Sequence, residues 1–221
     1  MIMDLTKEEV AKTIDHTYLR PEGKAETISK ICHEAKEFGF AAVAIAPYYI
    51  PLAARELEGS GIELSAAIGF PLGYTTPKTK AFEAREALEN GATEIDMVAN
   101  ISALKSGFWP EVEKDIRAVA ETCGNAILKV ILETCYLEEK EKKELIQLCL
   151  EIEGVDFLKT STGFGPAGAT IEDIKLFKKM AGASLGIKAS GGIKTLEECQ
   201  AMLKAGATRI GTSSGVKIMQ E

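Results

Sequence analysis

The amino-acid sequence predicts an α/β fold in which eight parallel strands close into a single (β/α)8 TIM barrel. Short apolar runs recur along the chain, and each is followed by a stretch with helical periodicity. The centres of the last seven runs lie 21 to 33 residues apart, which is the spacing of a repeated strand–helix unit. Strands that alternate with helices form parallel sheets, and eight units are enough to close a short barrel.

The eight predicted strands share a β-branched or apolar composition and are bounded by turn residues. In chain order they are TIDHTYL from Thr13, FAAVAIA from Phe40, IELSAAI from Ile62, TEIDMVA from Thr93, NAILKVIL from Asn125, VDFLKTS from Val155, SLGIKAS from Ser184 and TRIGTS from Thr208. The first run is included because it completes the set of eight. An open, doubly wound sheet is the alternative arrangement of the same units.

Six helices are predicted between these strands. Most of the segments end in Gly, which is favoured just past a helix C-terminus, and several begin with Thr or with Pro and acidic residues. They span residues 22–39, 76–91, 108–124, 137–154, 170–182 and 195–206. No linker, shift in composition or low-complexity tract divides the chain, so we expect one domain over residues 1–221.

Composition and charge restrict the classes of partner. With 46% hydrophobic and 27% charged residues the chain has the composition of a globular protein, and its formal charge of −7 disfavours binding to nucleic acid or to an anionic membrane. No apolar run is long enough to span a membrane, and the start MIMDLTKEEV lacks the order of a signal peptide. We therefore expect a cytoplasmic protein with neither kind of partner.

The cysteines and histidines do not form a metal-binding pattern. The five cysteines are odd in number, scattered and never in a C-x-x-C pair, so we expect reduced thiols with no disulfide framework and no zinc site. The two histidines are too few and too far apart in the sequence for most metal sites, and we interpret His16 as a packed structural residue. The cysteines are Cys32, Cys123, Cys135, Cys149 and Cys199, and the histidines are His16 and His33. A metal-free mechanism is expected.

Charged residues interrupt four consecutive predicted strands. Asp96 lies on the fourth strand, Lys129 on the fifth, Lys159 on the sixth and Lys188 on the seventh. A buried ammonium must pair with an anion or lose its proton. A single strand lysine is more often a paired or surface-reaching residue, but three on consecutive strands need another explanation. Desolvation and neighbouring cations lower a lysine pKa and free the amine that forms Schiff bases, so the pattern indicates imine chemistry.

Glycine-rich loops follow the seventh and eighth predicted strands. They read Ser-Gly-Gly-Ile at 190–193 and Gly-Thr-Ser-Ser-Gly at 211–215. Glycines let backbone N–H groups approach an anion, hydroxyls add donors, and a following helix supplies its positive end. Many barrels bind phosphate at these two loops, so we expect a phosphorylated ligand there.

The segment 163–168 matches the G-x-G-x-x-G pattern of dinucleotide sites, but its context argues against one. Pro166 removes an amide within the loop, the preceding strand comes late in the chain, and the residues about twenty positions further on hold no acid for a ribose. The sequence also lacks a P-loop, an H-E-x-x-H and a G-x-S-x-G motif. We expect no cofactor.

Taken together and in order, the motifs of this chain resemble those of the deoxyribose-phosphate aldolases. The resemblance runs nearly end to end through DHTYL, AVAIAP, IGFPLG, EIDMVANI, LKVILET, FLKTSTGF, KASGGIK and IGTSSG. It implies a metal-free class I aldolase that reversibly cleaves 2-deoxy-D-ribose 5-phosphate to D-glyceraldehyde 3-phosphate and acetaldehyde.

The resemblance also implies residue roles. It places the Schiff-base lysine at Lys159, the second catalytic lysine at Lys188 and the acid/base aspartate at Asp96. From their positions beside these residues, we expect Lys129 and Thr17 to support the site from behind. The substrate phosphate is expected to contact the loops that contain Gly163, Gly191, Gly192, Gly211, Ser213 and Ser214.

The chain departs from the family pattern at two places. Some members carry a lysine directly after the T-S-T-G turn, where this chain has Phe164, and some carry a longer C-terminal tail, whereas this sequence stops at Glu221. We expect phosphate affinity and tolerance of unphosphorylated aldehydes to differ accordingly.

Two other functions use the same features. A phosphosugar isomerase or epimerase would use Asp96 as a base without an imine, and a non-catalytic barrel would bind a phosphosugar through the glycine loops alone. Parallel barrels often associate through their outer helices, so a homodimer or homotetramer is expected.

Overall fold

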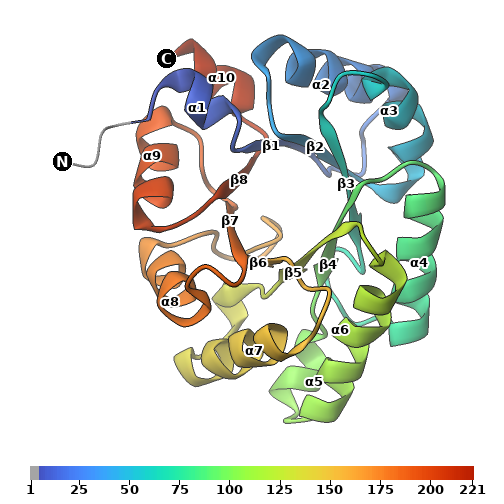
Figure 1. Ribbon diagram of the computed structural model, residues 1–221, viewed down its shortest axis with the longest axis vertical. Coiled ribbons are helices and arrows are strands. Elements are labelled where there is room, and N and C mark those ends of the chain that lie inside the picture. Colours follow the sequence, from blue (N-terminus) through green and yellow to red (C-terminus); the bar gives the residue numbers. More distant parts are fainter. Residues whose placement is uncertain (1–4) are drawn as a thin grey trace.

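Eight parallel strands close into a barrel in the computed structural model, which describes residues 5–221 (Figure 1). The strands are β1 (Ile14–Tyr18), β2 (Ala42–Ile45), β3 (Glu63–Ile68), β4 (Glu94–Val98), β5 (Ile127–Ile131), β6 (Phe157–Lys159), β7 (Gly186–Ser190) and β8 (Arg209–Thr212). Each pairs with the next along the chain, and β8 pairs with β1. All eight lie inside the predicted runs. The barrel prediction is therefore confirmed, and the open doubly wound sheet is wrong because that sheet would have two free edges.

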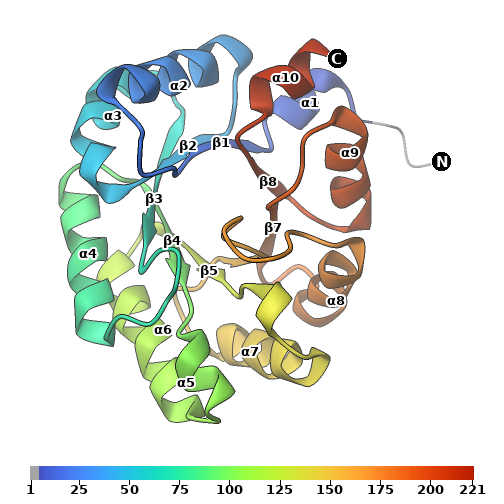
Figure 2. The same ribbon diagram turned by 180° about the vertical axis from the view of Figure 1, so that it is seen from behind.

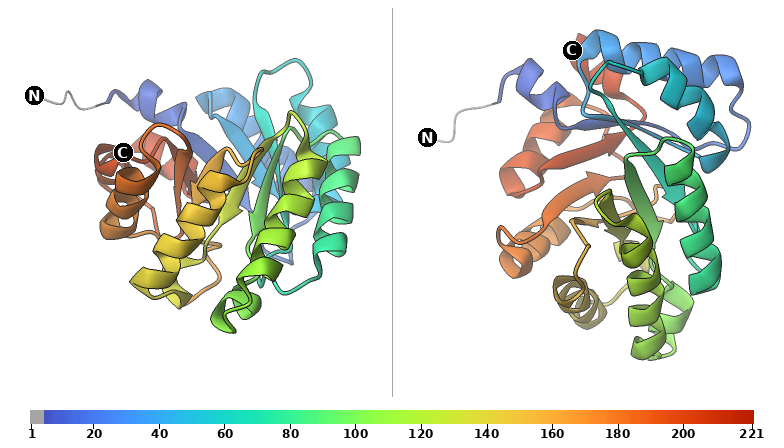
Figure 3. Two further views of the ribbon diagram at one scale, coloured as in Figure 1. Left: turned by 60° about the horizontal axis from the view of Figure 1, so that its bottom comes forward. Right: turned by 45° about the vertical axis from the view of Figure 1, so that its right-hand side comes forward.

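Helices surround the barrel on the outside, as Figures 1 and 3 show. The six predicted helices are α2 (Ala25–Phe38), α4 (Pro77–Glu89), α6 (Trp109–Cys123), α7 (Glu139–Glu151), α8 (Ile171–Ala181) and α9 (Leu196–Ala205). The structure adds α1 (Lys7–Ala11), α3 (Ile50–Leu57), α5 (Ile101–Lys105), α10 (Gly215–Gln220) and the 3-10 turns η1 (Pro47–Tyr49) and η2 (Thr134–Tyr136). Within residues 5–221, none of the helices combines the length and apolar character needed to cross a membrane.

Local sequence explains where several helices begin. The side chains of Thr76, Thr170 and Thr195 each accept a hydrogen bond from a backbone N–H in the first turn of α4, α8 and α9. Glu198 completes a reciprocal capping box with Thr195. At the other end of α2, Gly39 adopts the left-handed conformation with φ of 64°, which glycine enters without a steric penalty. The three threonine caps place the starts of α4, α8 and α9 at the carboxyl end of the barrel.

Strand alternation separates an apolar layer from a charged interior. Each strand has a buried apolar residue at an outward position that packs against the helices: Ile14, Val43, Leu64, Ile95, Leu128, Leu158, Ile187 and Ile210. The register pairs Asp96 with Lys129 and Lys159 with Lys188, so these four residues share the opposite, inward face. The lysines interrupt apolar runs because their neighbours on either side belong to the outer layer.

A buried ion pair connects α4 and α6 to the carboxyl end of β4. Lys80 Nζ donates to Asp115 Oδ2 at 2.5 Å and to the Val98 carbonyl oxygen at 2.7 Å, and both charged side chains are fully buried. Burial lowers the pKa of Lys80 and raises the pKa of Asp115, while their mutual attraction opposes both shifts. The pair fixes the end of β4 two residues beyond Asp96.

Removing one partner of this pair is expected to destabilise the fold. We expect Asp115→Leu to lower the free energy of unfolding by about 3 to 5 kcal/mol, because it leaves the Lys80 ammonium buried without a counter-charge. The double variant Lys80→Met with Asp115→Leu should lose less, because no uncompensated charge remains. Urea unfolding followed by circular dichroism measures both losses, and equal losses in the single and double variants would contradict the role of the charge.

Candidate active site

A network of buried charged side chains occupies the inside of the barrel. It extends from Arg209 and Glu94, at the starts of their strands, to Lys159, the last residue of β6. Its carboxylates belong to Asp15, Glu94 and Asp96, and its cations to Lys129, Lys159, Lys188 and Arg209.

Asp96 lies at the centre of this network, and the three lysines predicted from the sequence converge on it. Its Oδ2 accepts hydrogen bonds from Lys159 Nζ and Lys188 Nζ, each at 2.7 Å. Its Oδ1 accepts from Lys129 Nζ and from Ser65 Oγ, each at 2.8 Å. Burial raises the pKa of Asp96, but the three lysines outweigh it and hold that pKa well below its usual value. Asp96 is therefore an ionised carboxylate.

Lys129 and Arg209 are the permanent cations of the site. Lys129 Nζ contacts Glu94 as well as Asp96 and lies 3.9 Å from Asp15 Oδ2. Burial lowers the pKa of Lys129, but these carboxylates raise it above its ordinary value. Arg209 donates to Asp15 Oδ1 at 2.7 Å and to Glu94 Oε1 at 3.2 Å. Both side chains support the site from the amino-terminal side of Lys159.

Lys159 has a pKa below the ordinary value of a lysine side chain. Four basic side chains face three carboxylates. When all four basic groups are protonated and all three carboxylates are ionised, the network carries one surplus positive charge. Burial lowers the pKa of Lys159, Asp96 raises it and Lys188 lowers it again, which brings it from 10.5 to about 8. Loss of that proton balances the charges and leaves a neutral amine, only 3% exposed, at the carboxyl end of the barrel.

Several members of the network escaped the sequence analysis. Asp15 forms an ion pair with Lys188, and Arg209 and Glu94 complete the base of the site. One signal could have found Glu94, because it lies two residues before Asp96 and therefore shares its strand face. Asp15 and Arg209 meet through the β1–β8 pairing that closes the barrel.

The residues around the first strand have separate roles. The Thr17 hydroxyl donates to the Asp15 carbonyl oxygen at 2.9 Å, so it braces the strand that carries Asp15. His16 faces outward, where its Nε2 lies 2.8 Å from Glu34 Oε2 and its ring lies 5.0 Å from that of Phe40. These contacts fit the interpretation of His16 as a packed structural residue.

The loops after β6 and β7 lie against each other at the mouth of the barrel. Ala169 N donates to the carbonyl oxygens of Ser190 and Gly191 at 3.0 and 3.1 Å. A Cβ on Gly168 would lie 2.0 Å from the Gly191 oxygen, so this close approach requires glycine. The loop after β6 curls over the centre of the barrel in Figure 2.

The predicted phosphate residues occupy different environments. Gly163, Gly191 and Gly192 have positive φ angles of 85°, 86° and 85°, and a Cβ on Gly192 would meet nothing within 4 Å. The backbone at Gly192 is therefore open to a ligand.

The residues after β8 are more constrained. A Cβ on Gly211 would lie 3.0 Å from Lys188 Cε, so this glycine makes room for the lysine. The Ser214 amide donates to Thr212 Oγ1 at 2.9 Å, whereas Ser213 is exposed. Among the residues that the structure describes, no three His, Cys, Asp or Glu side chains are grouped so that they could hold a metal ion.

Comparison with known proteins identifies relatives along nearly the whole chain. The sequence model of the DeoC/LacD family aldolases matches residues 9–221. The chain is 52% identical over 215 residues to the deoxyribose-phosphate aldolase of Thermoanaerobacter sp. (strain X514), covering 96% of each chain. It is 53% identical over 209 residues to that of Streptococcus gordonii, covering 95% of this chain and 94% of the relative.

A solved structure shows the same fold. The tetrameric deoxyribose phosphate aldolase from Aeropyrum pernix superposes with a TM-score of 0.90 at 32% identity. The match covers 97% of this chain and 91% of that one.

The effect of Lys188 on Lys159 can be measured directly. We expect Lys188→Met to raise the pKa of Lys159 above about 8 by roughly one pH unit, because a neighbouring positive charge is removed. The pH dependence of reductive methylation of Lys159, followed by peptide mass spectrometry, reports this pKa. The exposed Lys194→Met is the matched control and should leave it in place. An unchanged pKa in Lys188→Met would contradict the proposed influence of Lys188.

Proposed function

The chain belongs to the DeoC/LacD family of aldolases, and we propose that it reversibly cleaves 2-deoxy-D-ribose 5-phosphate through a Schiff base on Lys159. The products are D-glyceraldehyde 3-phosphate and acetaldehyde. The observation that carries the proposal is the buried Lys159 amine, whose pKa is lowered to about 8 beside Asp96 and Lys188. The names of the bacterial relatives at 52% and 53% identity support the substrate.

The first steps use the neutral amine of Lys159. The amine attacks C1 of the open-chain aldehyde, and loss of water gives an iminium ion. The C2–C3 bond then breaks, its electron pair moves toward the iminium nitrogen, and the C3 hydroxyl loses a proton. D-glyceraldehyde 3-phosphate leaves, and an enamine of acetaldehyde remains on Lys159.

Asp96 moves protons in the following steps. Its Oδ2 lies 2.7 Å from both Lys159 Nζ and Lys188 Nζ, so it is adjacent to the reacting nitrogen. Acting through a water molecule, Asp96 receives the proton of the C3 hydroxyl and returns one to the enamine carbon. Hydrolysis of the resulting iminium releases acetaldehyde and restores the free amine.

The surrounding charges set the protonation states that these steps need. Lys188 lowers the pKa of Lys159, and Lys129 lowers the pKa of Asp96. Asp15 forms an ion pair with Lys188 and so offsets part of its charge. A Schiff-base mechanism requires this neutral amine, whereas an isomerase that used Asp96 alone, or a barrel that only bound ligand, would have no use for it.

We assign the phosphate of the substrate to the loops after β6, β7 and β8. The open backbone at Gly192, the positive φ of Gly163 and Gly191, and the exposed Ser213 support this assignment. Ser214 contributes its hydroxyl, because its amide is engaged by Thr212. Gly211 acts through the space that it leaves for Lys188.

We also propose that the chain forms a homodimer or homotetramer in the cytoplasm. The frequent association of parallel barrels through their outer helices supports the assembly. The related deoxyribose phosphate aldolase from Aeropyrum pernix is a tetramer.

Trapping with borohydride tests the covalent step. Acetaldehyde and sodium borohydride should inactivate the protein and leave a reduced two-carbon adduct on Lys159, located by peptide mapping. Lys159→Met should form no adduct and lose activity by about 10,000-fold or more, because the nucleophile is absent. A fully active Lys159→Met protein, or an adduct confined to another lysine, would exclude this mechanism.

Isotope exchange tests the role of Asp96. In D2O the enzyme should exchange the methyl protons of acetaldehyde through the enamine, and Asp96→Asn should slow this exchange by about 100- to 10,000-fold. Borohydride should still trap some imine in that variant, since Lys159 remains. Glu34→Gln, which changes a carboxylate outside the barrel, is the control. Exchange at the wild-type rate in Asp96→Asn would exclude the carboxylate as the proton carrier.

A further inference from the structure

Glu133, two residues after the end of β5, has a strained backbone conformation. Among residues 5–221 it is the one residue other than glycine with a positive φ angle, and its φ of 52° and ψ of 61° are left-handed. In this conformation a Cβ crowds the following carbonyl oxygen, whereas glycine adopts it without that penalty. Since a glycine here would relieve the backbone, the glutamate indicates that the side chain is needed.

The strained residue is an extra residue in the pairing of β5 with β6. Leu132 N donates to the Lys159 carbonyl oxygen at 2.9 Å, and Thr134 N donates to the Thr160 carbonyl oxygen at 3.0 Å. In a regular parallel ladder, donors two residues apart use acceptors two residues apart, but these two acceptors are neighbours in the chain. Glu133 therefore occupies a bulge, and bulges beside active sites redirect side chains.

The redirected side chain contacts the loop that follows β6. Glu133 is only 2% exposed, and its carboxylate accepts hydrogen bonds from Thr162 N, at 3.1 Å, and from Thr162 Oγ1. The Thr162 hydroxyl in turn accepts from Phe164 N at 3.0 Å. A Cβ on Gly165 would lie 3.4 Å from Glu133 Oε1, so this part of the loop also packs against the carboxylate.

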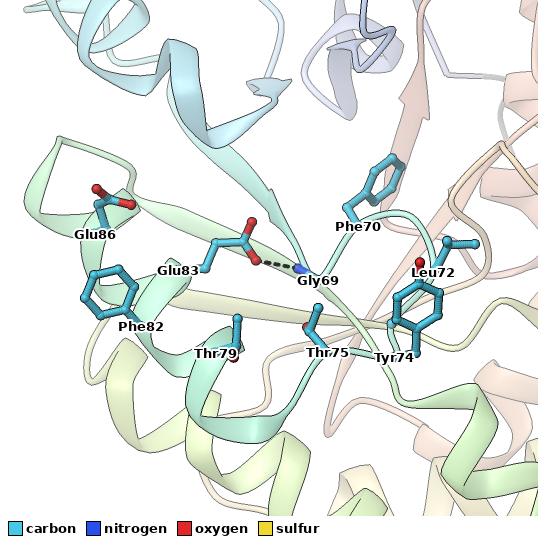
Figure 4. Close-up of a pocket in the computed structure, with 10 residues that line it drawn as sticks. Gly69, Phe70, Leu72, Tyr74, Thr75, Thr79, Phe82, Glu83 and Glu86 are labelled. Carbon is cyan, nitrogen blue, oxygen red and sulfur yellow. Dashed lines mark hydrogen bonds between the residues drawn. The ribbon is translucent and has the colours of Figure 1, made fainter.

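The other supports of this loop act further along it. The ring of Phe164 lies 5.3 Å from that of Phe70, whose own loop is fixed by a hydrogen bond from Gly69 N to Glu83 Oε2 on α4 (Figure 4). The end of the loop is held by Ala169 N, which donates to two carbonyl oxygens of the segment after β7. The carboxylate of Glu133 is therefore the support of the loop where it leaves β6.

We infer that Glu133 is a positioning residue that holds the loop of residues 162–168 in the conformation that receives the substrate phosphate. Gly163, whose φ is 85°, directly follows the residue that the carboxylate binds. The inference rests on the proposed function, which assigns the phosphate to this loop among others, and adds the side chain that orders it. A loop that is ordered before binding lowers the entropic cost of binding. Glu133 acts through Thr162.

Two substitutions separate the carboxylate from the backbone strain. Glu133→Gly removes both acceptor oxygens and relieves the left-handed conformation, whereas Glu133→Gln keeps one acceptor. We expect Glu133→Gly to raise KM for 2-deoxy-D-ribose 5-phosphate by about 10- to 100-fold, with kcat within about threefold, because hydrogen bonds to a charged acceptor are lost. Glu133→Gln should raise KM by less, about 3- to 10-fold.

A second substrate and a second site test how Glu133 acts. The two variants should keep kcat/KM for unphosphorylated 2-deoxy-D-ribose within about twofold of wild type, because that substrate has no phosphate for the loop to hold. Thr162→Val should also raise KM for the phosphorylated substrate. The double variant with Glu133→Gly should lose little more than Glu133→Gly alone, because both changes remove one contact. Glu144→Gln, on the outer helix α7, is the matched control.

The outcomes distinguish this inference from the proposed function. Equal losses for both substrates, a loss confined to kcat, a wild-type KM in Glu133→Gly, or additive losses in the double variant would overturn the inference. Borohydride trapping of acetaldehyde on Lys159 is measured in parallel, and its failure in the wild-type protein overturns the proposed function instead. If Glu133→Gly does not fold, Glu133→Asn tolerates the left-handed conformation with a side chain one methylene shorter, and it should show the same rise in KM.

Discussion

The convergence of three ammonium groups on the carboxylate of Asp96 is the interaction on which the interior of this barrel depends. Buried charges are tolerated when each has an opposite partner, and the interior holds four cations for three carboxylates. The imbalance falls on Lys159, because burial and Lys188 both lower its pKa. The reactivity of one lysine is therefore a property of the whole network.

The strand period of two makes such an interior compatible with a stable fold. Outward positions such as Ile95 and Leu128 build the apolar layer beneath the helices, while their inward neighbours Asp96 and Lys129 face the network. The loops at the carboxyl end are then held by local contacts, among them Lys80 against the end of β4 and Glu83 against Gly69. The inward side chains of the strands therefore carry the chemistry, and the outward side chains of the same strands stabilise the fold.

Much of this could be predicted from the sequence. The strands followed from short apolar runs at a regular spacing, and Asp96 and the three lysines stood out as charges within them. Asp15 and Arg209 could not be found in this way, because their contact arises from barrel closure and not from any local pattern. The short helices α3 and α5 offered too few residues for a periodic signal. The sequence places Gly211 in a predicted phosphate-binding loop. In the structure it lies beside Lys188, where a side chain would collide with the lysine, and this contact explains why the position is a glycine.

The pairing of β8 with β1 also orders events during protein synthesis. Asp15 is made early, but its partner Arg209 lies 194 residues further along the chain. Until β8 has left the ribosome, the first seven strands hold Asp15 and Glu94 without the guanidinium that bridges them. Without Arg209 the network holds three lysines for three carboxylates, so the surplus positive charge appears only when β8 has been made. The charged network of the barrel is therefore complete only when β8 pairs with β1.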